Sequence, residues 1–588
     1  MMAAPADPPH HPMDNQDIAR ILAEIGVLLE LNGENPFKVR AYAAAARQIE
    51  ALGVPVRTLA AENRLNEIPG IGEGLSEKIA TLVNTGRLDY HEALKASVPP
   101  GLLDILRVPS IGPKKARALR EQLGVETLAD LEAACRSGRL AGLPGFGKRS
   151  EEKILEGIAF LARHQGRALY AEALAPARDL LAALTGCPAV TRASLAGSIR
   201  RCRETIKDID VVAASERPAE AMAAFTSHPL VHEVKAAGET KGTVRLLTGI
   251  SADLRVVPDA DFPCTLHHLT GSKDHNVALR ALAQKRGLKV SEWGVFRGEE
   301  RLPVADEAAL FAHLGLAFIP PELRENLGEI EAAAEGALPE LLELRDLRGI
   351  LHVHSSWSDG VPTIEAWARR AGELGYAYVA ICDHSAAAAY AGGLSPARLE
   401  KQIAEIDAVN AQGAGATVLK GIETDILPNG TLDMPDELLA RLDLVIASVH
   451  SQLGMSERAM TDRVCRALEN PRVDILGHPT GRLLLQREGY PLDLEAVLAS
   501  ARRHGVALEL NAHPQRLDLD WRHLKRARDL GIRIAINPDA HMLSGIDDVR
   551  YGVGIARKGW IRKQDVLNTL PLEEFRRALR RGKATGGS

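Results

Sequence analysis

Between residues 349 and 541, apolar runs typical of strands repeatedly end in a histidine or a carboxylate, and a helical segment follows each run. Strands that alternate with helices in this way form β/α units, whose functional residues gather at the carboxyl ends of the strands. His352 and His354 are two residues apart on the first run, so both imidazoles face one way, and Asp359 follows in the loop. The other side chains of this pattern are His384, Glu423, His450, His478, Asp539 and His541.

Imidazoles and carboxylates at successive strand ends are typical of a metal centre. A single histidine in such a place is more often an ordinary core or surface residue, but the joint pattern favours metal binding. Mixed nitrogen and oxygen ligands favour Mn, Zn or Fe over Mg. The pattern therefore predicts β/α units with a metal site at the ends of their strands.

A second candidate metal site lies earlier, in the stretch AGSIRRCRETIKDIDVV at residues 196–212. Its flanks predict strand, turn and strand, and on a strand Asp208 and Asp210 would point to the same face. Two adjacent carboxylates repel each other unless a cation, usually a divalent metal, lies between them. Asp253 in the later run ADLRVVP would complete a two-metal site. The alternative is a surface turn with a solvated acidic pair.

The same stretch carries groups that hold phosphates. Gly197 and Ser198 offer backbone N–H groups and a hydroxyl, and Arg200, Arg201 and Arg203 add fixed positive charge. A phosphate grip beside a metal-binding carboxylate pair is typical of nucleotidyl transfer, in which one ion activates a 3′-hydroxyl and the other holds a triphosphate.

Three short hairpins with a glycine in the turn resemble one another in the helical region before this stretch, at residues 66–79, 107–119 and 142–154. Each predicts a helix-hairpin-helix unit, whose turn amides and following helix N-terminus can hold a DNA phosphate without reading sequence. Glycine also caps helices for structural reasons, so the inference rests on the repetition. The candidate DNA contacts are Gly70, Gly72, Gly112, Lys114, Gly145, Gly147 and Lys148.

The chain has 588 residues, too many for one core, and its net charge of −5 leaves any nucleic-acid contact to local patches. Six cysteines without a C-x-x-C pair predict free thiols in a reducing compartment. The first residues predict a disordered leader and lack the apolar core of a signal peptide, and no apolar run is long enough to span a membrane. We therefore expect a cytoplasmic protein without membrane contact.

Residues 18–320 resemble the X-family DNA polymerases, such as DNA polymerase beta, through the motifs GSIRR, DID, ADLR and LTGSKDHN. The resemblance implies that Asp208, Asp210 and Asp253 are catalytic ligands of Mg or Mn. It also implies a set of residues around the incoming nucleotide and template. These are Gly197, Ser198, Arg201, His268, Gly271, Asn276 and Arg280.

Two sites in the sequence depart from this family's pattern, and a third carries the lysine that gives some members lyase activity. The family usually has glycine directly before the first catalytic aspartate, where this chain has Lys207. It commonly has Tyr-Phe where this chain has His268 and Leu269, which predicts looser packing around the 2′ position of the sugar. The family's amino-terminal domain often carries a Schiff-base lysine with lyase activity. Lys78 occupies that position, with a phosphate contact as the alternative role.

Residues 349–588 resemble the PHP (polymerase and histidinol phosphatase) domains, which implies a distorted β/α barrel with a trinuclear metal centre. Every ligand position of that pattern is occupied, from His352 to His541. The implied chemistry is hydrolysis of a phosphoester by a metal-activated hydroxide. With DNA-binding hairpins on the same chain, the expected substrate is a DNA 3′ end or an abasic-site phosphodiester.

Together these resemblances imply a multidomain fold with an all-α helix-hairpin-helix N-terminal region, an α+β nucleotidyltransferase palm and a C-terminal distorted β/α barrel. The expected divisions are a disordered leader (1–17), a lyase-like helical domain (18–90), a second helix-hairpin-helix region (91–165), the palm (166–265), a nucleotide-binding polymerase subdomain (266–320), a linker (321–348) and the PHP phosphoesterase domain (349–588).

We expect a DNA-directed DNA polymerase that fills gaps in base excision repair or end joining, with a PHP domain that acts as a 3′-5′ exonuclease or AP endonuclease. The expected partners are gapped or nicked duplex DNA and dNTPs, and the expected state is a monomer. Three alternatives remain open. They are a DNA phosphoesterase with a decayed polymerase half, a nucleotidyltransferase and phosphoesterase for a small non-DNA substrate, and a purely structural DNA-binding protein.

Overall fold

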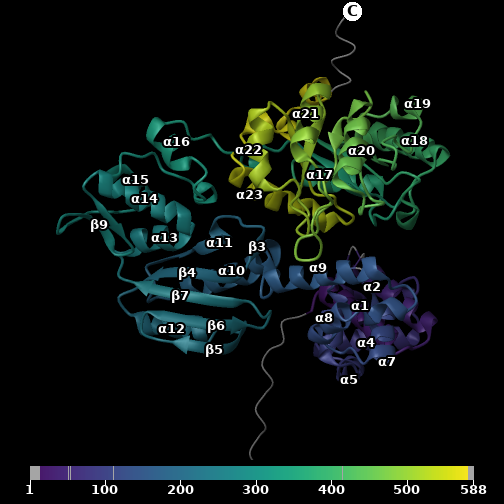
Figure 1. Cartoon of the computed structure of the whole chain (residues 1–588), viewed down its shortest axis with the longest axis horizontal. Helices are drawn as coiled ribbons and strands as arrows, with labels where there is room; N and C mark the ends of the chain where they lie inside the picture. The colour runs from purple at the N-terminus through teal and green to yellow at the C-terminus, as the bar shows by residue number, and fades with distance from the viewer. Residues whose placement is uncertain (1–12, 51, 53, 110, 414, 580–588) are drawn as a thin grey trace, which may run out of the picture. The chain divides into compact units, whose positions relative to one another are not determined.

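The computed structural model describes residues 13–579 apart from residues 51, 53, 110 and 414, and Figure 1 shows it as a ribbon. The chain divides into two compact units, Met1–Gln165 and Gly166–Ser588. Residues 1–12 of the expected leader lie outside the described part. None of the described helices combines the length and the apolar character that crossing a membrane requires.

The first unit is built from helices that enclose two apolar cores. One core lies among α1, α2 and α4, and the other among α6, α7, α8 and α9. Helix α1 begins with a capping box in which the side chains of Asp14 and Asp17 accept from each other's backbone N–H. The helices are α1 (Asn15–Leu31), α2 (Pro36–Glu50), α3 (Val56–Ala61), α4 (Glu73–Thr85), α5 (Asp89–Ser97), α6 (Pro100–Leu106), α7 (Pro113–Leu123), α8 (Leu128–Arg136) and α9 (Lys148–His164).

The three predicted hairpins share one turn geometry, which confirms the prediction of helix-hairpin-helix units. In each turn the middle residue is buried, and its backbone N–H donates to the carbonyl three residues earlier at 3.0 to 3.1 Å. These residues are Ile71, Ile111 and Phe146. The next helix begins directly after a glycine, because an N-cap residue adopts extended backbone angles. These glycines are Gly72, Gly112 and Gly147.

The second unit begins with a palm whose five-stranded sheet has the order β2-β4-β7-β6-β5, with α12 on the sheet in Figure 1. Strands β4 and β7 are parallel, and the other neighbours are antiparallel. The elements are β1 (Ala168–Leu169), α10 (Tyr170–Thr185), β2 (Arg192–Leu195), α11 (Gly197–Arg200), β3 (Thr205–Ile206), β4 (Asp208–Ala214), α12 (Pro218–Thr226), β5 (Val231–Ala237), β6 (Lys241–Leu246) and β7 (Ser251–Val257).

Alternation along β4 decides where its aspartates point. Ile209, Val211 and Ala213 pack with α10 and α12 on one face of the sheet. Val212 and Ala214 pack with α13 (Phe262–Thr270) on the other face. Because side chains two residues apart share a face, the two aspartates of β4 lie on the α13 side.

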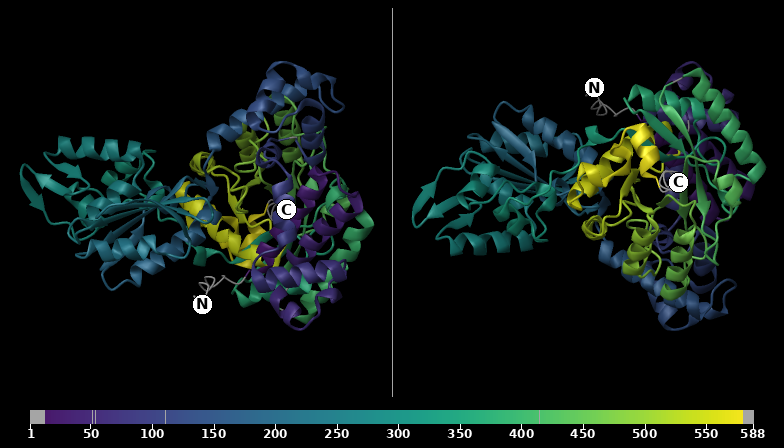
Figure 2. Two further views of the ribbon diagram at one scale, coloured as in Figure 1. Left: turned by 90° about the horizontal axis from the view of Figure 1, so that it is seen from below. Right: turned by 90° about the horizontal axis from the view of Figure 1, so that it is seen from above.

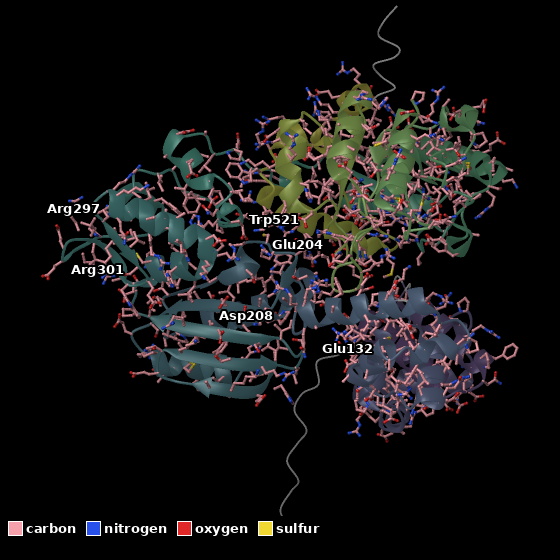
Figure 3. The ribbon with its side chains drawn as sticks, viewed as in Figure 1. Glu132, Glu204, Asp208, Arg297, Arg301 and Trp521 are labelled. Carbon is pink, nitrogen blue, oxygen red and sulfur yellow. The ribbon has the colours of Figure 1, made fainter. Side chains whose placement is uncertain are left out.

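A smaller helical subdomain with a three-stranded sheet follows the palm, and Figure 3 labels Arg297 and Arg301 on its sheet. Its further elements are α14 (Lys273–Lys285), β8 (Lys289–Ser291), β9 (Gly294–Arg297), β10 (Glu300–Leu302) and α15 (Glu307–His313). Residues 321–348, expected as a linker, contain α16 (Glu329–Glu335) and several fully buried side chains. Leu323, Arg324 and Leu342 are examples, so this stretch packs against its neighbours along part of its length.

The rest of the second unit is a nearly closed barrel of seven parallel strands in chain order. They are β11 (Gly349–Val353), β12 (Tyr378–Ile381), β13 (Thr417–Asp425), β14 (Leu444–Ser448), β15 (Ile475–Leu476), β16 (Ala507–Asn511) and β17 (Ile534–Asn537). A parallel bridge between Val353 and Ala540 joins the first strand to the end of the last. The prediction of a β/α barrel is confirmed.

Helices surround the barrel, as Figure 2 shows. They are α17 (Ile364–Glu373), α18 (Pro396–Gln412), α19 (Asp436–Leu439), α20 (Glu457–Glu469), α21 (Leu494–His504), α22 (Trp521–Asp529), α23 (Val549–Lys558) and α24 (Leu572–Ala578). Phe575 of α24 stacks on Tyr378, the first residue of β12, with ring centroids 5.1 Å apart. Because α24 covers the amino ends of the strands, the carboxyl ends are left for a site.

Candidate functional sites

Three carboxylates converge on the palm sheet as the sequence predicted. Asp210 on β4 lies directly opposite Asp253 on β7, and Asp208 precedes Asp210 on the same face. Thr243 on the neighbouring strand β6 donates its hydroxyl hydrogen to the Asp253 carboxylate. Burial first, and then the charges of Asp208 and Asp253, raise the pKa of Asp210 to about 7. Such mutual repulsion is what a divalent cation relieves, so these residues fit a metal site.

The turn before this strand is shaped around Asp210. Gly197 has a φ of +60°, and a Cβ atom there would lie 1.9 Å from Oδ2 of Asp210. Any other residue would therefore collide with the carboxylate as well as strain the backbone. Ser198 follows in the short helix α11, half-buried. Lys207 is exposed, one residue before β4, and alternation places it away from the aspartates.

The predicted phosphate-holding arginines are engaged in ion pairs that tie the turn to later segments. Arg200 pairs with Glu307 at 2.6 Å and donates to the hydroxyl of Thr270. Arg201 donates to the backbone carbonyl of Thr270 at 2.7 Å and to Glu325 at 2.9 Å. Sequence reasoning missed Glu307 and Glu325, because they lie more than 100 residues from their partners.

The residues predicted to line the nucleotide pocket lie where α13 ends and α14 begins. Asn276 donates from Nδ2 to the backbone carbonyl of His268 at 2.8 Å, while its buried Oδ1 has no hydrogen-bond partner. A Cβ atom on Gly271 would lie 2.5 Å from that same oxygen, so the site requires glycine. The half-buried His268 has its pKa lowered by burial, and Arg280 is exposed further along α14.

The turns of the hairpins leave space for a phosphate. A Cβ atom on any of the predicted glycines would find nothing within 4 Å, and Lys114 is exposed at the start of α7. The glycines are Gly70, Gly72, Gly112, Gly145 and Gly147. Lys148 begins α9, but its side chain lies outside the described part of the chain.

Lys78, the candidate lyase residue, lies on α4 beside an aromatic ring and a second lysine. Its Nζ donates to the carbonyl of Gly74 at 3.0 Å and lies 5.5 Å from the ring centroid of Tyr90. Nζ of Lys38 lies at the same distance from that ring. The interaction with Tyr90 raises the pKa of Lys38, which keeps a cation close to Lys78.

All predicted ligands of the barrel converge at the carboxyl ends of its strands. Groups of ligand atoms that lie within 4.8 Å of one another are formed by His354, Asp359, His384 and His541; by His352, His354 and Asp539; and by His384, Glu423 and His450. His478 joins the third group, since its Nε2 is 2.9 Å from Glu423 and 3.3 Å from His450. Glu423 lies between these groups, with His352, His384, His450 and His478 all within 3.4 Å.

The electrostatics and backbone of this cluster fit a multinuclear metal centre. Although burial opposes it, hydrogen bonding and charge from His541 lower the pKa of Asp359 to about 2. Burial and two neighbouring imidazoles lower the pKa of His354 to about 3. Buried ligand atoms such as Nε2 of His352 make no hydrogen bond. His352 and Asp539 hold left-handed backbone angles, a strain that is typical of functional sites.

Partners behind the ligands hold them in place, and sequence reasoning missed them. Glu509, fully buried on β16, accepts from Nδ1 of His352 and from the backbone N–H of His478, both at 2.6 Å. Asn511 donates to Asp539 at 2.9 Å. The sequence did contain a sign of Glu509, because a carboxylate is unusual inside an apolar strand such as ALELN. Such partners fix the ring orientation and tautomer of metal-binding histidines.

The palm aspartates differ from the barrel ligands in one respect. Among the described residues, His, Cys, Asp or Glu ligand atoms that meet within 4.8 Å in groups of three or more occur only in the barrel. The three palm carboxylates are therefore spaced more widely than the barrel ligands. An open carboxylate site suits ions that arrive with a phosphate-bearing substrate, whereas the closed barrel cluster suits resident ions.

Comparisons with protein families match four parts of the chain. Residues 13–88 match the helix-hairpin-helix domain, 102–159 the SAM-like helix-hairpin-helix tandem, 265–325 the DNA polymerase beta thumb and 351–513 the PHP domain. The chain is 42% identical over 573 residues to the "DNA polymerase/3′-5′ exonuclease PolX" of Bacillus subtilis, which covers 97% of this chain and 100% of that protein.

The chain is also similar over part of its length to other proteins. A probable phosphatase of Acetivibrio thermocellus is 32% identical over 201 residues, which are 32% of this chain and 78% of that protein. A probable phosphatase of Syntrophotalea carbinolica is 36% identical over 166 residues, which are 27% of this chain and 64% of that protein.

Proposed function

Because the chain belongs to the PolX family of bacterial DNA polymerase/3′-5′ exonucleases, we propose that it extends DNA primers at the palm and hydrolyses DNA ends at the barrel. The observation that carries the first activity is the parallel pairing of β4 with β7, which brings Asp208, Asp210 and Asp253 to one face. The converging ligands of the barrel carry the second.

In the palm, the three aspartates would hold Mg or Mn. Two such ions activate a primer 3′-hydroxyl and stabilise the charge of a leaving diphosphate. Ser198 and Arg201 bind the triphosphate, since they follow the turn that touches Asp210. Gly271, Asn276 and His268 line the sugar of the incoming nucleotide, and Asn276 fixes the main chain there by its hydrogen bond to the His268 carbonyl.

In the barrel, the imidazoles and carboxylates would hold Mn, Zn or Fe. Such a centre supplies a nucleophile at neutral pH and neutralises the charge of a phosphodiester. Glu423 orders the ligands by its position between the histidines, and Glu509 holds His352 in orientation. The substrate is a DNA 3′ end, and a second substrate is the phosphodiester at an abasic site.

The hairpins of the first unit support a role in gap filling during repair. Their open glycine turns can hold backbone phosphates of duplex DNA without reading sequence. Arg280, exposed on α14, would approach the template strand. We propose that the protein works as a monomer on gapped or nicked duplexes in base excision repair and in end joining.

The test is to incubate the purified protein with an end-labelled duplex that carries a short gap, in Mg or Mn. With dNTPs the primer should lengthen by the size of the gap, and without dNTPs its 3′ end should shorten. A duplex with one abasic site tests incision in parallel, and a blunt duplex of the same sequence is the control. Absence of template-dependent extension would contradict the polymerase proposal.

Lys78 is proposed as a lyase nucleophile, because it occupies the position of the family's Schiff-base lysine and lies beside the Tyr90 ring and Lys38 on the first hairpin. Borohydride should trap a covalent adduct with a 5′-incised abasic duplex, and Lys78→Ala should lose it. Lys114→Ala, which removes an exposed lysine of the second hairpin, is the matched control. An adduct of equal yield in both variants would leave Lys78 as a phosphate contact.

A further inference from the structure

Two helices of the barrel, α22 and α23, pack against the polymerase segment that follows the Gly-Ser turn. Figure 3 labels Glu204 and Trp521 at this contact. Arg522 lies 3.3 Å from Glu204, and the guanidinium of Arg203 lies over the ring of Trp521 at 5.6 Å. Arg557 pairs with Glu322 at 2.7 Å. The contact therefore consists of ion pairs and a cation–π pair. It includes Arg203, which lies two residues after the proposed triphosphate ligand Arg201.

Lys558, the last residue of α23, is the most deeply placed charge in this contact. Its side chain is 1% exposed. Nζ donates to Oε1 of Glu325 at 2.5 Å and to the backbone carbonyl of Arg201 at 3.1 Å. Nζ also lies 4.4 Å from the ring centroid of Trp521. Burial of an ammonium group is costly, so this set of partners marks a specific position for the amine.

Lys558 and Arg201 share one carboxylate oxygen. Nε of Arg201 donates to the same Oε1 of Glu325 at 2.9 Å, and Arg203 lies 3.6 Å from the other oxygen. Three cations thus surround one carboxylate whose side chain is 9% exposed. Arg203 also lies 3.8 Å from Glu204. Three cations thus face two carboxylates, and the group keeps a net positive charge next to the Gly-Ser turn.

We propose that Lys558 of the barrel is a positioning residue for nucleotide binding at the palm. By sharing Glu325 it fixes the guanidinium of Arg201, and it leaves the charge of Arg201 available to a triphosphate. The inference rests on the proposed triphosphate role of Arg201. It means that the barrel completes the polymerase site in addition to its own hydrolytic chemistry.

The direction of the effect follows from the charges. A neutral side chain at position 558 would leave Glu325 to pair more tightly with Arg201, and the local charge would fall by one. The KM for dNTP should then rise by roughly tenfold, as expected when one partner of a buried charged network is removed. Hydrolysis at the barrel should continue, because Lys558 lies outside the ligand cluster.

The experiment measures kcat and KM for dNTP on a one-nucleotide gap with the full chain. Lys558→Met should raise KM, and Lys558→Arg should restore it to within about threefold of the unmodified protein, because the charge is kept. Lys525→Met is the matched control. Lys525 also reaches from the barrel to the polymerase half, where it donates to the carbonyl of Leu327 at 3.0 Å, but it touches neither Arg201 nor Glu325.

Exonuclease activity of the same preparations shows whether each variant is folded. An unchanged KM in an exonuclease-active Lys558→Met variant would overturn the inference, as would an equal rise in Lys525→Met. Arg201→Met separates the two proposals. If it leaves KM unchanged, the triphosphate role of Arg201 is wrong; if it raises KM while Lys558→Met does not, only the present inference fails.

A pH profile covers the case in which Lys558→Met does not fold. Burial, opposed in part by Glu325, lowers the pKa of Lys558 to about 8. The charged groups that face it are Glu325, Arg201, Arg203 and the Arg557–Glu322 pair. The nearby Cys202 thiol, whose pKa burial raises to about 11, stays neutral between pH 7 and about 9. KM for dNTP should therefore rise across this range in the unmodified protein and stay level in Lys558→Arg. Equal profiles would overturn the inference.

Discussion

Asp210 stands between two other carboxylates on the palm sheet, and burial together with their charges raises its pKa to about 7. In the unfolded chain its pKa is close to 3.8. A folded-state pKa above the unfolded one means that this group costs stability as pH rises from about 4 to about 7. Without metal, the charged Asp210 therefore destabilises the folded palm at neutral and alkaline pH.

Asp210→Asn should raise the apparent melting temperature of the chelator-treated protein by a few degrees at pH 8, and by much less at pH 4. The same substitution should abolish primer extension, because a metal ligand is lost. Asp462→Asn, at an exposed position on α20, is the control and should change neither. Thermal melts at the two pH values test this. A lower melting temperature for Asp210→Asn at pH 8 would contradict the electrostatic reasoning.

His268 is half-buried and stands where relatives of DNA polymerase beta commonly carry a tyrosine, a position proposed to face the sugar of the incoming nucleotide. We predict weak discrimination against ribonucleotides, strengthened by His268→Tyr, because a larger ring would crowd the 2′-hydroxyl. A modest change in packing can shift such selectivity by about tenfold. The measurement is the ratio of kcat/KM for dNTP and rNTP in both proteins. Strong deoxy preference that His268→Tyr leaves unchanged would assign the crowding to the main chain.

At the residue scale, the sequence allowed the prediction of those site residues that follow a local pattern. The barrel ligands stood out because each one ends an apolar strand, and Asp208 and Asp210 because of their spacing. Glu325 and Lys558 could not be found in this way, and the only sign of Glu509 was a carboxylate within the apolar run ALELN. Each acts on a partner more than 100 residues away, and only the folded packing brings the pair together.

At the scale of elements, the hairpins repeat one structure from three different sequences. A buried residue anchors each turn, and the space beside its glycines is open. We expect affinity for gapped duplex to fall steeply with added salt and to vary little with sequence, since these turns are proposed to hold phosphates. Fluorescence anisotropy between 50 and about 200 mM salt measures this, and a loss of roughly tenfold or more is expected. A flat salt response would revive a small non-DNA substrate.

The barrel shows which features of a fold the hydrophobic pattern of a sequence can predict. Alternating strands and helices were predictable, because parallel strands buried on both faces are continuous apolar runs. The number of strands and the closure of the sheet into a barrel could not be predicted from the sequence. Strand β15 has only two residues, and a single bridge from Val353 to Ala540 joins the ends of the sheet. Such closure depends on pairing between distant segments, which periodicity does not encode.

At the scale of the whole molecule, the barrel and the polymerase half of the second unit share a specific contact. The contact of α22 and α23 with the polymerase half places the charge of Lys558 beside the residues that are proposed to hold the triphosphate. The sequence indicated two active halves but not their coupling, because the residues of the contact follow no motif. The stretch 321–348 contributes to this contact through Glu322 and Glu325.

The central claim is that one chain carries two metal sites with separate chemistries, and paired variants test it most directly. Asp208→Ala and His352→Ala are each assayed on one end-labelled gapped duplex, with and without dNTPs. Asp208→Ala should lose extension by about three orders of magnitude and keep 3′-end hydrolysis, and His352→Ala should do the reverse. Each retained activity shows that the variant is folded. If Asp208→Ala extended the primer at the unmodified rate, or if both variants lost both activities while remaining folded, the account would be contradicted.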